Sequence, residues 1–245
     1  MCIIFVAYQI RHDYPLVLIA NRDEFYSRPT APAKYWTDHP YIYAGRDLIG
    51  NGTWLGVTNG GRFAAVTNHR NPKMPKGSST RGYLVSDFLA SKTSCEDYLA
   101  KVESEAAKYS GFNLLVGEVS NDEDELWYYS NRFDAEPRKL HRGIYGLSNA
   151  FLDTPWPKVE KGRRKFEDLL SDMHFSTDSY FELLSNEERA HCDELPDTGI
   201  GQTAEHALSS IFIRTPEYGT RSSTVLTIDS DFIPSLIEKV HDSAE

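Results

Sequence analysis

Cysteine is scarce in this sequence, and its scarcity excludes one class of protein. The 245 residues contain three cysteines, Cys2, Cys95 and Cys192. A sparse and odd-numbered set does not give the paired framework that holds small secreted domains together. We therefore expect free thiols, a reducing compartment and a cytoplasmic location.

Long apolar runs are absent as well. The two longest, residues 2–8 and 16–20, are far shorter than the roughly 20 residues with which a helix spans a bilayer. No positively charged leader precedes the first run. We expect the N-terminus to be part of the fold, and we expect no integral membrane segment.

Positive charge is in deficit. Lys and Arg together number 26 against 36 for Asp and Glu, which gives a formal net charge of -10. General attraction to nucleic acid or to an anionic membrane surface is not expected of such a chain. We therefore expect no nucleic-acid partner, while a local basic patch stays open.

Motifs for resident metals and haem are missing. The run "HCDE" at residues 191–194 has neighbouring side chains that cannot easily converge on one ion, and no second cluster has metal-site spacing. The Cys-x-x-Cys-His motif of covalent haem attachment does not occur. We expect no metal site and no required cofactor.

What the sequence does contain is enough apolar material for one large core. Residues of apolar type make up 40% and aromatic residues 12%, with no repeat, low-complexity tract or long linker, so we expect a single domain over residues 1–245. Strands are expected early, at 2–8, at 16–21 and on both sides of Asn59-Gly60-Gly61, and late, at 210–214 and 223–228. Helices are expected between them, at 81–92 and 96–108 among others. This order predicts an α+β fold with antiparallel sheet covered by helices.

Cys2 directly follows Met1. A thiol is a strong nucleophile as thiolate, and loss of Met1 would give Cys2 an α-amino group whose unperturbed pKa of about 7.7 to 8.0 suits an adjacent base. The second strand delivers Arg22 and Asp23 to its end, where they could hold the thiolate and orient the amine. The alternative is a small buried hydrophobe at Cys2 and a plain ion pair between Arg22 and Asp23.

Two asparagines each end a predicted strand, Asn68 in "VTNH" and Asn149 in "GLSNA". Side-chain amides can donate hydrogen bonds to a developing oxyanion, so these residues are candidates for an oxyanion hole. The alternative is that both are turn formers.

A basic loop interrupts this acidic protein. The sequence "HRNPKMPKGSSTR" concentrates five residues that could receive the carboxylates or phosphates of an anionic ligand: His69, Arg70, Lys73, Lys76 and Arg81. The alternative is an ordinary solvated loop. The sequence does not indicate an oligomeric state.

Several stretches together resemble a known family: "MCIIF", "LIANRDEFYSRPT", "NGTWLGVT", "AAVTNHR", "GFNLLVG", "YGLSNAFLDTPWPKV" and "PEYGTRSSTVLTID". They are similar to the NRDE family, also called the transport and Golgi organisation protein 2 family, over residues 1 to about 229. The resemblance implies an N-terminal-nucleophile hydrolase-like αββα sandwich of two mainly antiparallel sheets flanked by helices. It also implies a link to haem trafficking or to acyl-coenzyme A and lipid metabolism.

A more distant resemblance, to choloylglycine hydrolases and penicillin V acylases, concerns the site. It implies a nucleophile-like Cys2 with Arg22 and Asp23 as partners, and Asn149 and Arg221 as distal candidates. Those enzymes typically separate the Arg and Asp by two residues, whereas here they are adjacent. Adjacent residues of a strand point to opposite faces, so we expect that one of the pair cannot face the thiol.

Two functions follow, from different classes. The first is a non-catalytic carrier of haem, or of a similar amphipathic anion such as acyl-coenzyme A, on a hydrolase-like scaffold. The alternative is a cysteine amidohydrolase or thioesterase that uses Cys2. Fold alone does not separate them, because function depends on the site.

Overall fold

Two sheets form the centre of the molecule in the computed structural model, which describes residues 2–73, 76–132, 136–172 and 176–241. The strands of the first sheet are β1 (Cys2–Tyr8), β2 (Leu16–Phe25), β10 (Gly143–Leu147), β11 (Tyr218–Ile228) and β12 (Pro234–Val240). Those of the second are β3 (Thr30–Tyr35), β4 (Ile42–Asp47), β5 (Leu55–Thr58), β6 (Arg62–Asn68), β7 (Phe112–Val119), β8 (Asp124–Ser130) and β9 (Arg138–Leu140). Their orders are β10-β1-β2-β11-β12 and β3-β4-β5-β6-β7-β8-β9, and the described pairings within them are antiparallel.

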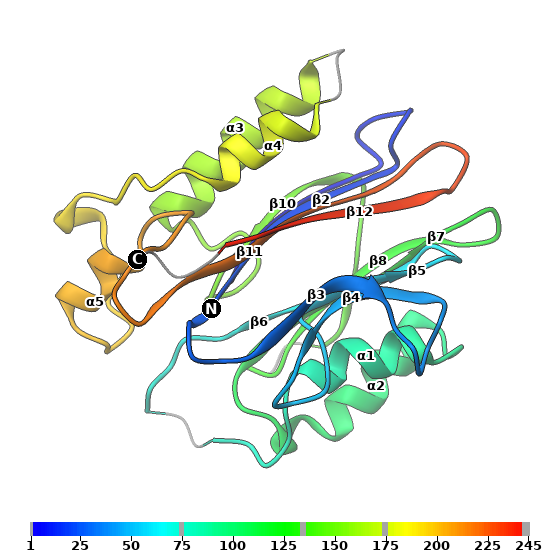
Figure 1. The fold of residues 1–245 in the computed structure, drawn as a ribbon, viewed down its shortest axis with the longest axis horizontal. Coiled ribbons are helices and arrows are strands. Elements are labelled where there is room, and N and C mark those ends of the chain that lie inside the picture. The colour runs from blue at the N-terminus through cyan, green and yellow to red at the C-terminus, as the bar shows by residue number, and fades with distance from the viewer. Residues whose placement is uncertain (1, 74–75, 133–135, 173–175, 242–245) are drawn as a thin grey trace.

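Helices cover the outer face of each sheet, as Figure 1 shows. α3 (Pro157–Ser171) and α4 (Thr177–Leu184) lie on the first sheet, while α1 (Gly82–Ala90) and α2 (Cys95–Ser104) lie on the second. The short elements are α5 (Gln202–Ala207) and the 3-10 turns at Ala106–Lys108 and Cys192–Glu194. The layer order expected from the sequence, αββα, is therefore confirmed. Within the described part of the chain, no helix is both long and apolar enough to cross a membrane.

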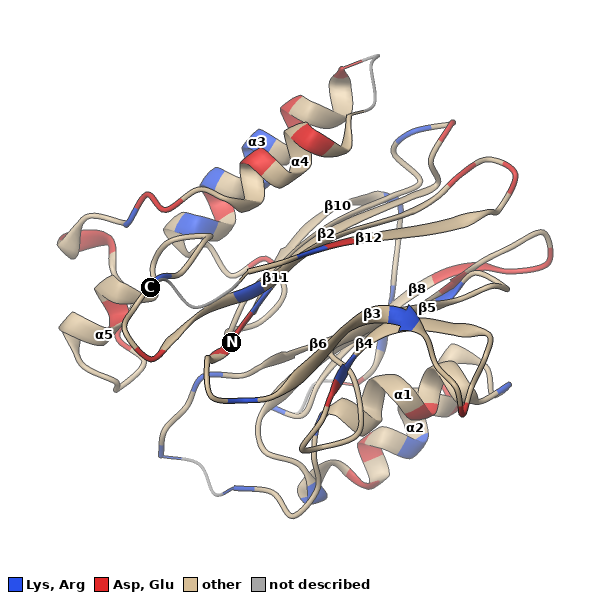
Figure 2. Ribbon diagram, in the orientation of Figure 1, with Lys and Arg blue, Asp and Glu red and all other residues tan. Residues whose placement is uncertain are grey.

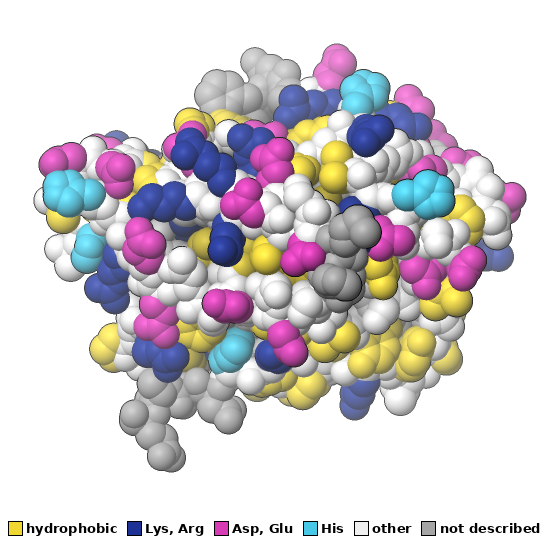
Figure 3. Space-filling view, turned by 90° about the horizontal axis from the view of Figure 1, so that it is seen from above, with side chains coloured by type: hydrophobic (Ala, Val, Ile, Leu, Met, Phe, Trp, Pro, Cys, Tyr) yellow, Lys and Arg dark blue, Asp and Glu magenta, His cyan; other side chains and the backbone are white. Residues whose placement is uncertain are grey.

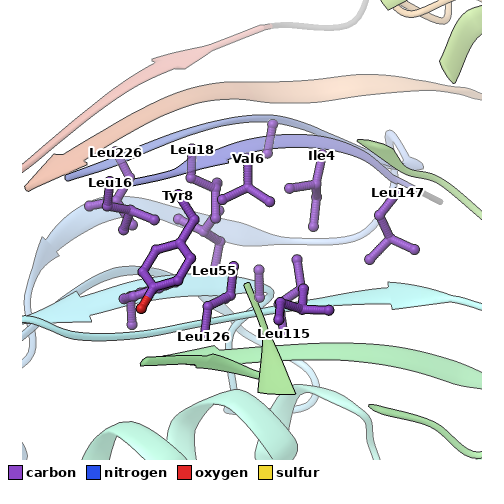
Figure 4. Packing of buried hydrophobic residues seen from close by; sticks show 14 of the residues in the cluster. Ile4, Val6, Tyr8, Leu16, Leu18, Leu55, Leu115, Leu126, Leu147 and Leu226 are labelled. Atoms are coloured by element: carbon purple, nitrogen blue, oxygen red, sulfur yellow. The ribbon is translucent and has the colours of Figure 1, made fainter. Parts of the chain in front are cut away.

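β1 is apolar on both faces because both faces are covered. One set of its side chains, shown in Figure 4, points into the core between the two sheets: Ile4, Val6 and Tyr8. The alternate set packs under α3 and α4: Ile3, Phe5 and Ala7. β1 is also paired on both edges, with β10 and β2. β1 is therefore an interior strand of its sheet, which fits its lack of a polar face.

Close packing fixes α3 on β1. The ring centroids of Phe5 and Phe166 are 6.1 Å apart, and a Cβ added at Gly162 would lie 2.2 Å from a ring carbon of Phe5. Burying a phenylalanine contributes roughly 1.5–3 kcal/mol. This contact sets the depth at which α3 sits on the sheet and so the position of its first turn.

One expected strand is wrong. Residues 210–214 do not form a strand in the structure, apart from an isolated bridge between Arg214 and Gly219. Ile211 and Ile213 are buried against other elements instead, and the backbone N–H of Phe212 donates to the carbonyl of Asn186 at 2.8 Å. The apolar run therefore reflects burial in the core and not pairing in a sheet.

Candidate functional site

Cys2 lines a cavity of about 170 Å³ at one end of the two sheets. Its strand partner across the ladder is Arg22, and the following residue, Asp23, also contributes to the wall. The other lining residues come from the end of β2 and the loop after it, from β4, from the segment before β5, from β6, from the segment that leads into α1 and from the residues before β7: Glu24, Arg28, Asp47, Thr53, Trp54, Val66, Asn68, Ser79, Thr80, Arg81, Gly82 and Ser110. Figure 2 shows basic and acidic positions on the strands near the start of the chain. The cavity is thus a polar, charged site.

Arg22 extends from β2 toward the other sheet. Its guanidinium lies 4.2 Å from the ring centroid of Trp54, and its Nη1 donates to Thr30 Oγ1 at 2.9 Å. Burial lowers the pKa of Arg22, but an arginine keeps its charge at any working pH. Arg22 therefore brings a fixed positive charge to the wall of the Cys2 cavity.

Asp23 extends to the opposite face of the sheet, beneath the helices. Its Oδ1 accepts from Thr220 Oγ1 at 2.7 Å, and its carbonyl accepts from the Tyr218 hydroxyl at 2.8 Å. Burial raises the pKa of this carboxyl, while Lys158, Thr220 and Arg22 act to lower it. The adjacent Arg22 and Asp23 thus lie on opposite faces, and both act electrostatically on Cys2, the first residue of β1.

The Cys2 thiol has a raised pKa because burial disfavours the thiolate, and the Asp23 carboxylate adds to the effect. The Asp23 backbone N–H and the Arg22 guanidinium act in the opposite direction. A thiol in this setting is protonated at neutral pH and requires a base to react. Met1, whose removal would supply an amine, lies outside the described residues.

The two asparagines have different roles in the structure. Asn68 lines the cavity at the end of β6. Asn149 is fully buried, and its amide Nδ2 donates to the Asn68 carbonyl at 2.9 Å. The neighbouring Ser148 hydroxyl donates to the Cys2 carbonyl at 3.2 Å. Asn68 is therefore available to a ligand, and Asn149 supports the end of β6.

Arg221 sits at a bulge in β11, between Thr220 and Ser222. Its Nη1 donates to the carbonyls of Phe25, Tyr26 and Arg28 at 3.0, 3.2 and 3.1 Å. It is not among the residues that line the Cys2 cavity. In this arrangement Arg221 holds the loop after β2.

The basic loop borders a second cavity of about 340 Å³. Arg81 and Ser110 line both this cavity and the Cys2 cavity, so the two adjoin. The Arg81 Nη1 donates to the Gly111 carbonyl at 3.1 Å, and burial lowers its pKa. The remaining lining residues are His69, Asn71, Pro72, Lys76, Gly111 and Arg132. Arg132 was not expected from the sequence, because it lies far from the basic loop along the chain.

The other loop residues behave differently. Lys73 is exposed and does not line the cavity. Arg70 turns inward to a buried ion pair with Glu205 and stacks 4.9 Å from the ring centroid of Trp156. The ring centroids of His69 and Phe151 are 4.8 Å apart. Burial and the charge of Arg132 lower the pKa of His69. Among the described residues, no group of three His, Cys, Asp or Glu side chains could hold a metal ion.

Lys158 is a charged residue near Cys2 that was not expected. It is 5% exposed at the start of α3, and its Nζ donates to the Leu208 carbonyl at 2.9 Å. Burial lowers the pKa of Lys158 to about 8, although the negative charges of Asp23 and Cys2 act to raise it. A signal existed in the sequence, because Lys158 precedes Gly162, Phe166 and Leu170 at four-residue spacing on the buried face of the helix.

A cavity of about 380 Å³ lies elsewhere, between α3 and α4. Lys158, Lys161, Lys165, Glu182 and Glu188 are among its lining residues. Figure 3, the view from above, shows basic and acidic side chains interspersed with apolar ones. None of the residues expected from the sequence lines this cavity.

Comparisons with known proteins agree with the fold. The family model "Transport and Golgi organisation 2" matches residues 1–243. The human "Transport and Golgi organization protein 2 homolog" is 38% identical over 253 residues, which cover 94% of this chain and 90% of that protein. The Drosophila melanogaster "Transport and Golgi organization protein 2" is 26% identical over 260 residues, which cover 98% of this chain and 92% of that protein.

A solved structure has a similar fold. The Caenorhabditis elegans ortholog of N-acylethanolamine-hydrolyzing acid amidase gives a TM-score of 0.51 at 12% identity, over 96% of this chain and all 100% of that one. The fold is therefore N-terminal-nucleophile hydrolase-like, an α+β sandwich of two antiparallel sheets. With the family match over residues 1–243, it follows that the chain belongs to the Transport and Golgi organisation 2 family.

Proposed function

We propose that this protein hydrolyses an acyl compound, an amide or a thioester, through Cys2. The observation that carries the proposal is the position of Cys2 in a cavity, opposite Arg22 in the ladder and next to Asp23. A nucleophile needs a base, an orienting carboxylate and donors for the oxyanion, and each has a candidate here. They are the α-amino group of Cys2 once Met1 is removed, Asp23, and the side-chain amide of Asn68.

The proposed reaction has two steps. The Cys2 sulfur forms a bond to the acyl carbon while its proton passes to the α-amino group, and the tetrahedral oxyanion accepts from Asn68. Collapse breaks the C–N or C–S bond, and the leaving group takes the proton. Water then attacks the acyl-cysteine, which releases a carboxylic acid and restores the thiol.

The substrate that we propose is anionic and longer than the Cys2 cavity. A volume of about 170 Å³ is below the roughly 300–1,000 Å³ of sites that enclose a drug-sized ligand, so it takes only the reacting end. The remainder would extend past Arg81 into the adjoining cavity, where Lys76 and Arg132 favour a phosphate or carboxylate. Acyl-coenzyme A has this charge: its thioester would lie at Cys2 and its phosphates in the adjoining cavity. The nematode fold neighbour is by name an amidase, which is why amides stay in the proposal.

The test compares Cys2→Ala with Cys192→Ala, because Cys192 is an exposed thiol outside the cavity. Turnover of palmitoyl-coenzyme A and of an N-acyl amide is measured, together with the intact mass. We expect Cys2→Ala to abolish turnover and Cys192→Ala to leave it unchanged, in protein that lacks Met1. Turnover that survives Cys2→Ala, or active protein that retains Met1, would overturn the proposal.

A second candidate is the carrier of haem or acyl-coenzyme A, in the cytoplasm. Two observations favour it. Burial raises the pKa of the Cys2 thiol and so keeps it protonated, and the second cavity is lined by basic residues. A carrier must hold an anion without reacting with it. Each lost exposed contact is worth about 0.2–1 kcal/mol, so removing several should weaken binding measurably.

The carrier test replaces Lys73, Lys76 and Arg81 together by Ala and titrates the protein with haem and with palmitoyl-coenzyme A. We expect weaker binding with a flatter salt dependence, while Cys2→Ala binds as the parent does. The control removes three positive charges elsewhere, at Lys92, Lys101 and Lys161. Equal affinities in the two triple variants would contradict the carrier assignment.

A further inference from the structure

The cavity between α3 and α4 is not used by the proposed reaction. Its volume of about 380 Å³ falls within the roughly 300–1,000 Å³ of sites that enclose a small molecule. On α3 the lining runs from Pro157 to Leu169, a distance of about 18 Å along the helix axis. A volume of this size spread over that length is narrow. It therefore suits one unbranched chain better than a broad ring system.

Apolar side chains from four segments line part of this cavity. They come from both helices, from the residues after α4 and from the segment before β11: Pro157, Leu169, Leu183, Ala190 and Ile211. Lys161 and Lys165 lie on the same face of α3, and lysines at a rim can cover an apolar wall with their methylene stems. The Lys161 ammonium is already engaged, because it pairs with Glu188 at 2.8 Å. The cavity thus combines an apolar wall with a row of lysines.

Lys158 brings a buried positive charge to the same cavity, in the first turn of α3. Only 5% of it is exposed, and burying an ammonium is costly unless other groups compensate it. An ammonium has three donors, and the hydrogen bond described for this one goes to the Leu208 carbonyl at 2.9 Å. The ion pairs among the described residues do not include Lys158. A ligand anion would give it the charged partner that these residues do not.

We propose that this cavity binds an aliphatic monocarboxylate, with its carboxylate on the Lys158 ammonium and its unbranched chain along α3 toward Leu169. Charge complementarity identifies the head group, because an ammonium and a carboxylate form a strong, charge-assisted hydrogen bond. The length of the cavity and its apolar side chains identify the tail. The inference does not rest on the proposed hydrolysis, although a carboxylic acid is what that reaction releases.

The probe is sodium decanoate, titrated into the protein by isothermal titration calorimetry. We expect one saturable site per chain, which Lys158→Met weakens by about tenfold or more because a charge-assisted hydrogen bond is lost. This variant should fold, since an apolar chain of similar length replaces a buried ammonium. The control Lys101→Met removes an exposed lysine of α2 and should bind decanoate as the parent does. Equal affinities in the two variants, or no saturable binding by the parent, would overturn the proposal.

Ser179→Trp tests the place of the chain without changing the ammonium. Ser179 lines the cavity from α4 and is half-buried, so an indole there would fill part of the space. We expect decanoate to bind about tenfold more weakly or worse. The control Ser171→Trp lies at the exposed end of α3, outside the cavity lining, and should leave binding unchanged. Equal affinities for the two tryptophan variants would also overturn the proposal.

Three further probes separate the head group from the tail. Acetate lacks the chain and decyltrimethylammonium carries the opposite charge, so we expect neither to compete with decanoate. Competition by either, or decyl phosphate binding more than about tenfold tighter than decanoate, would overturn the carboxylate assignment.

Arg81→Ala distinguishes this cavity from the Cys2 cavity, whose wall it alters. We expect it to bind decanoate as the parent does, and a loss of binding there would place the ligand at Cys2 and overturn the proposal. These titrations need no turnover. Inactive protein that binds decanoate as expected would count against the hydrolase only, and active protein without such binding would count against this inference only.

Discussion

Asn149 donates a hydrogen bond from its side-chain amide to the backbone carbonyl of Asn68, 2.9 Å away, and so joins the two sheets beside Cys2. Asn149 follows β10 of the first sheet, and Asn68 ends β6 of the second. The return contact comes from the Arg70 backbone N–H, which donates to the Asn149 carbonyl at 2.7 Å. The cavity wall that contains Asn68 therefore depends on a residue that does not touch the cavity.

Replacing Asn149 by Ala should lower the free energy of unfolding by about 1–3 kcal/mol, because it leaves the partly buried Asn68 carbonyl without this donor. Urea denaturation followed by circular dichroism measures the change. Asn121→Ala, in an exposed turn, is the control and should change stability by less than about 0.5 kcal/mol. Similar values for both variants would refute the role given to Asn149.

Arg70 and Glu205 form a buried ion pair, with side chains 7% and 2% exposed. Arg70→Met should destabilise the fold by about 3–5 kcal/mol, because it leaves Glu205 buried and unpaired. The double variant Arg70→Met, Glu205→Gln should recover part of that loss. Chemical denaturation of the four proteins of the cycle gives the coupling energy.

The exposed pair Lys161–Glu188, with side chains 55% and 63% exposed, is the matched control. Its lysine-to-methionine variant should cost no more than about 1 kcal/mol. A comparable loss at the two sites would mean that burial does not decide the strength of the Arg70–Glu205 interaction.

Gly162→Ala should destabilise the protein by about 1–3 kcal/mol, because the new methyl group would overlap the ring of Phe5 and push α3 off the sheet. Gly60→Ala is the control, since its added Cβ meets only Thr58 Oγ1 at 3.9 Å. Thermal unfolding of the two variants shows the difference. An unchanged midpoint for Gly162→Ala would show that the contact is looser than described.

The stability of the protein should rise with pH through the titration of Lys158. Its pKa is about 8 in the folded chain and about 10.4 in an unfolded one, so between these values the unfolded state binds more protons. The penalty for the buried charge is complete below pH 8 and is relieved above it. Relative to Lys158→Met, wild-type protein should gain on the order of 2 kcal/mol between pH 7 and pH 10. A pH-independent difference in denaturation free energy would contradict the lowered pKa.

Much of the architecture was predictable, because local signals agree with it. The turn at Asn59-Gly60-Gly61 joins β5 to β6, and Gly61 has the positive φ, 83°, that glycine permits. Ser94 caps α2 by accepting from the Asp97 backbone N–H at 3.1 Å. The edge strands β3 and β12 were not expected, since they are short of buried apolar residues and depend on pairing with distant segments.

The candidate site was predictable where it follows from strand register. Cys2 and Arg22 were expected close together because a short hairpin joins their strands. Which basic-loop residues face a cavity was not predictable, because Arg70 finds a partner in Glu205, 135 positions away. Arg132 likewise reaches the second cavity only through tertiary packing. Charge clusters that are assembled across the fold leave no local pattern in the sequence.

Cys2 begins a strand that is held in place from several directions. Ile4 and the residues after it are hydrogen-bonded to β10 on one edge and to β2 on the other, and Ser148 holds the Cys2 carbonyl. Amide hydrogens in such a strand exchange with solvent only when the whole domain opens. The backbone that carries the Cys2 sulfur is therefore fixed by the sheet. Any motion that admits a ligand must come from the loops around the cavity, with the thiol as the fixed point toward which the ligand moves.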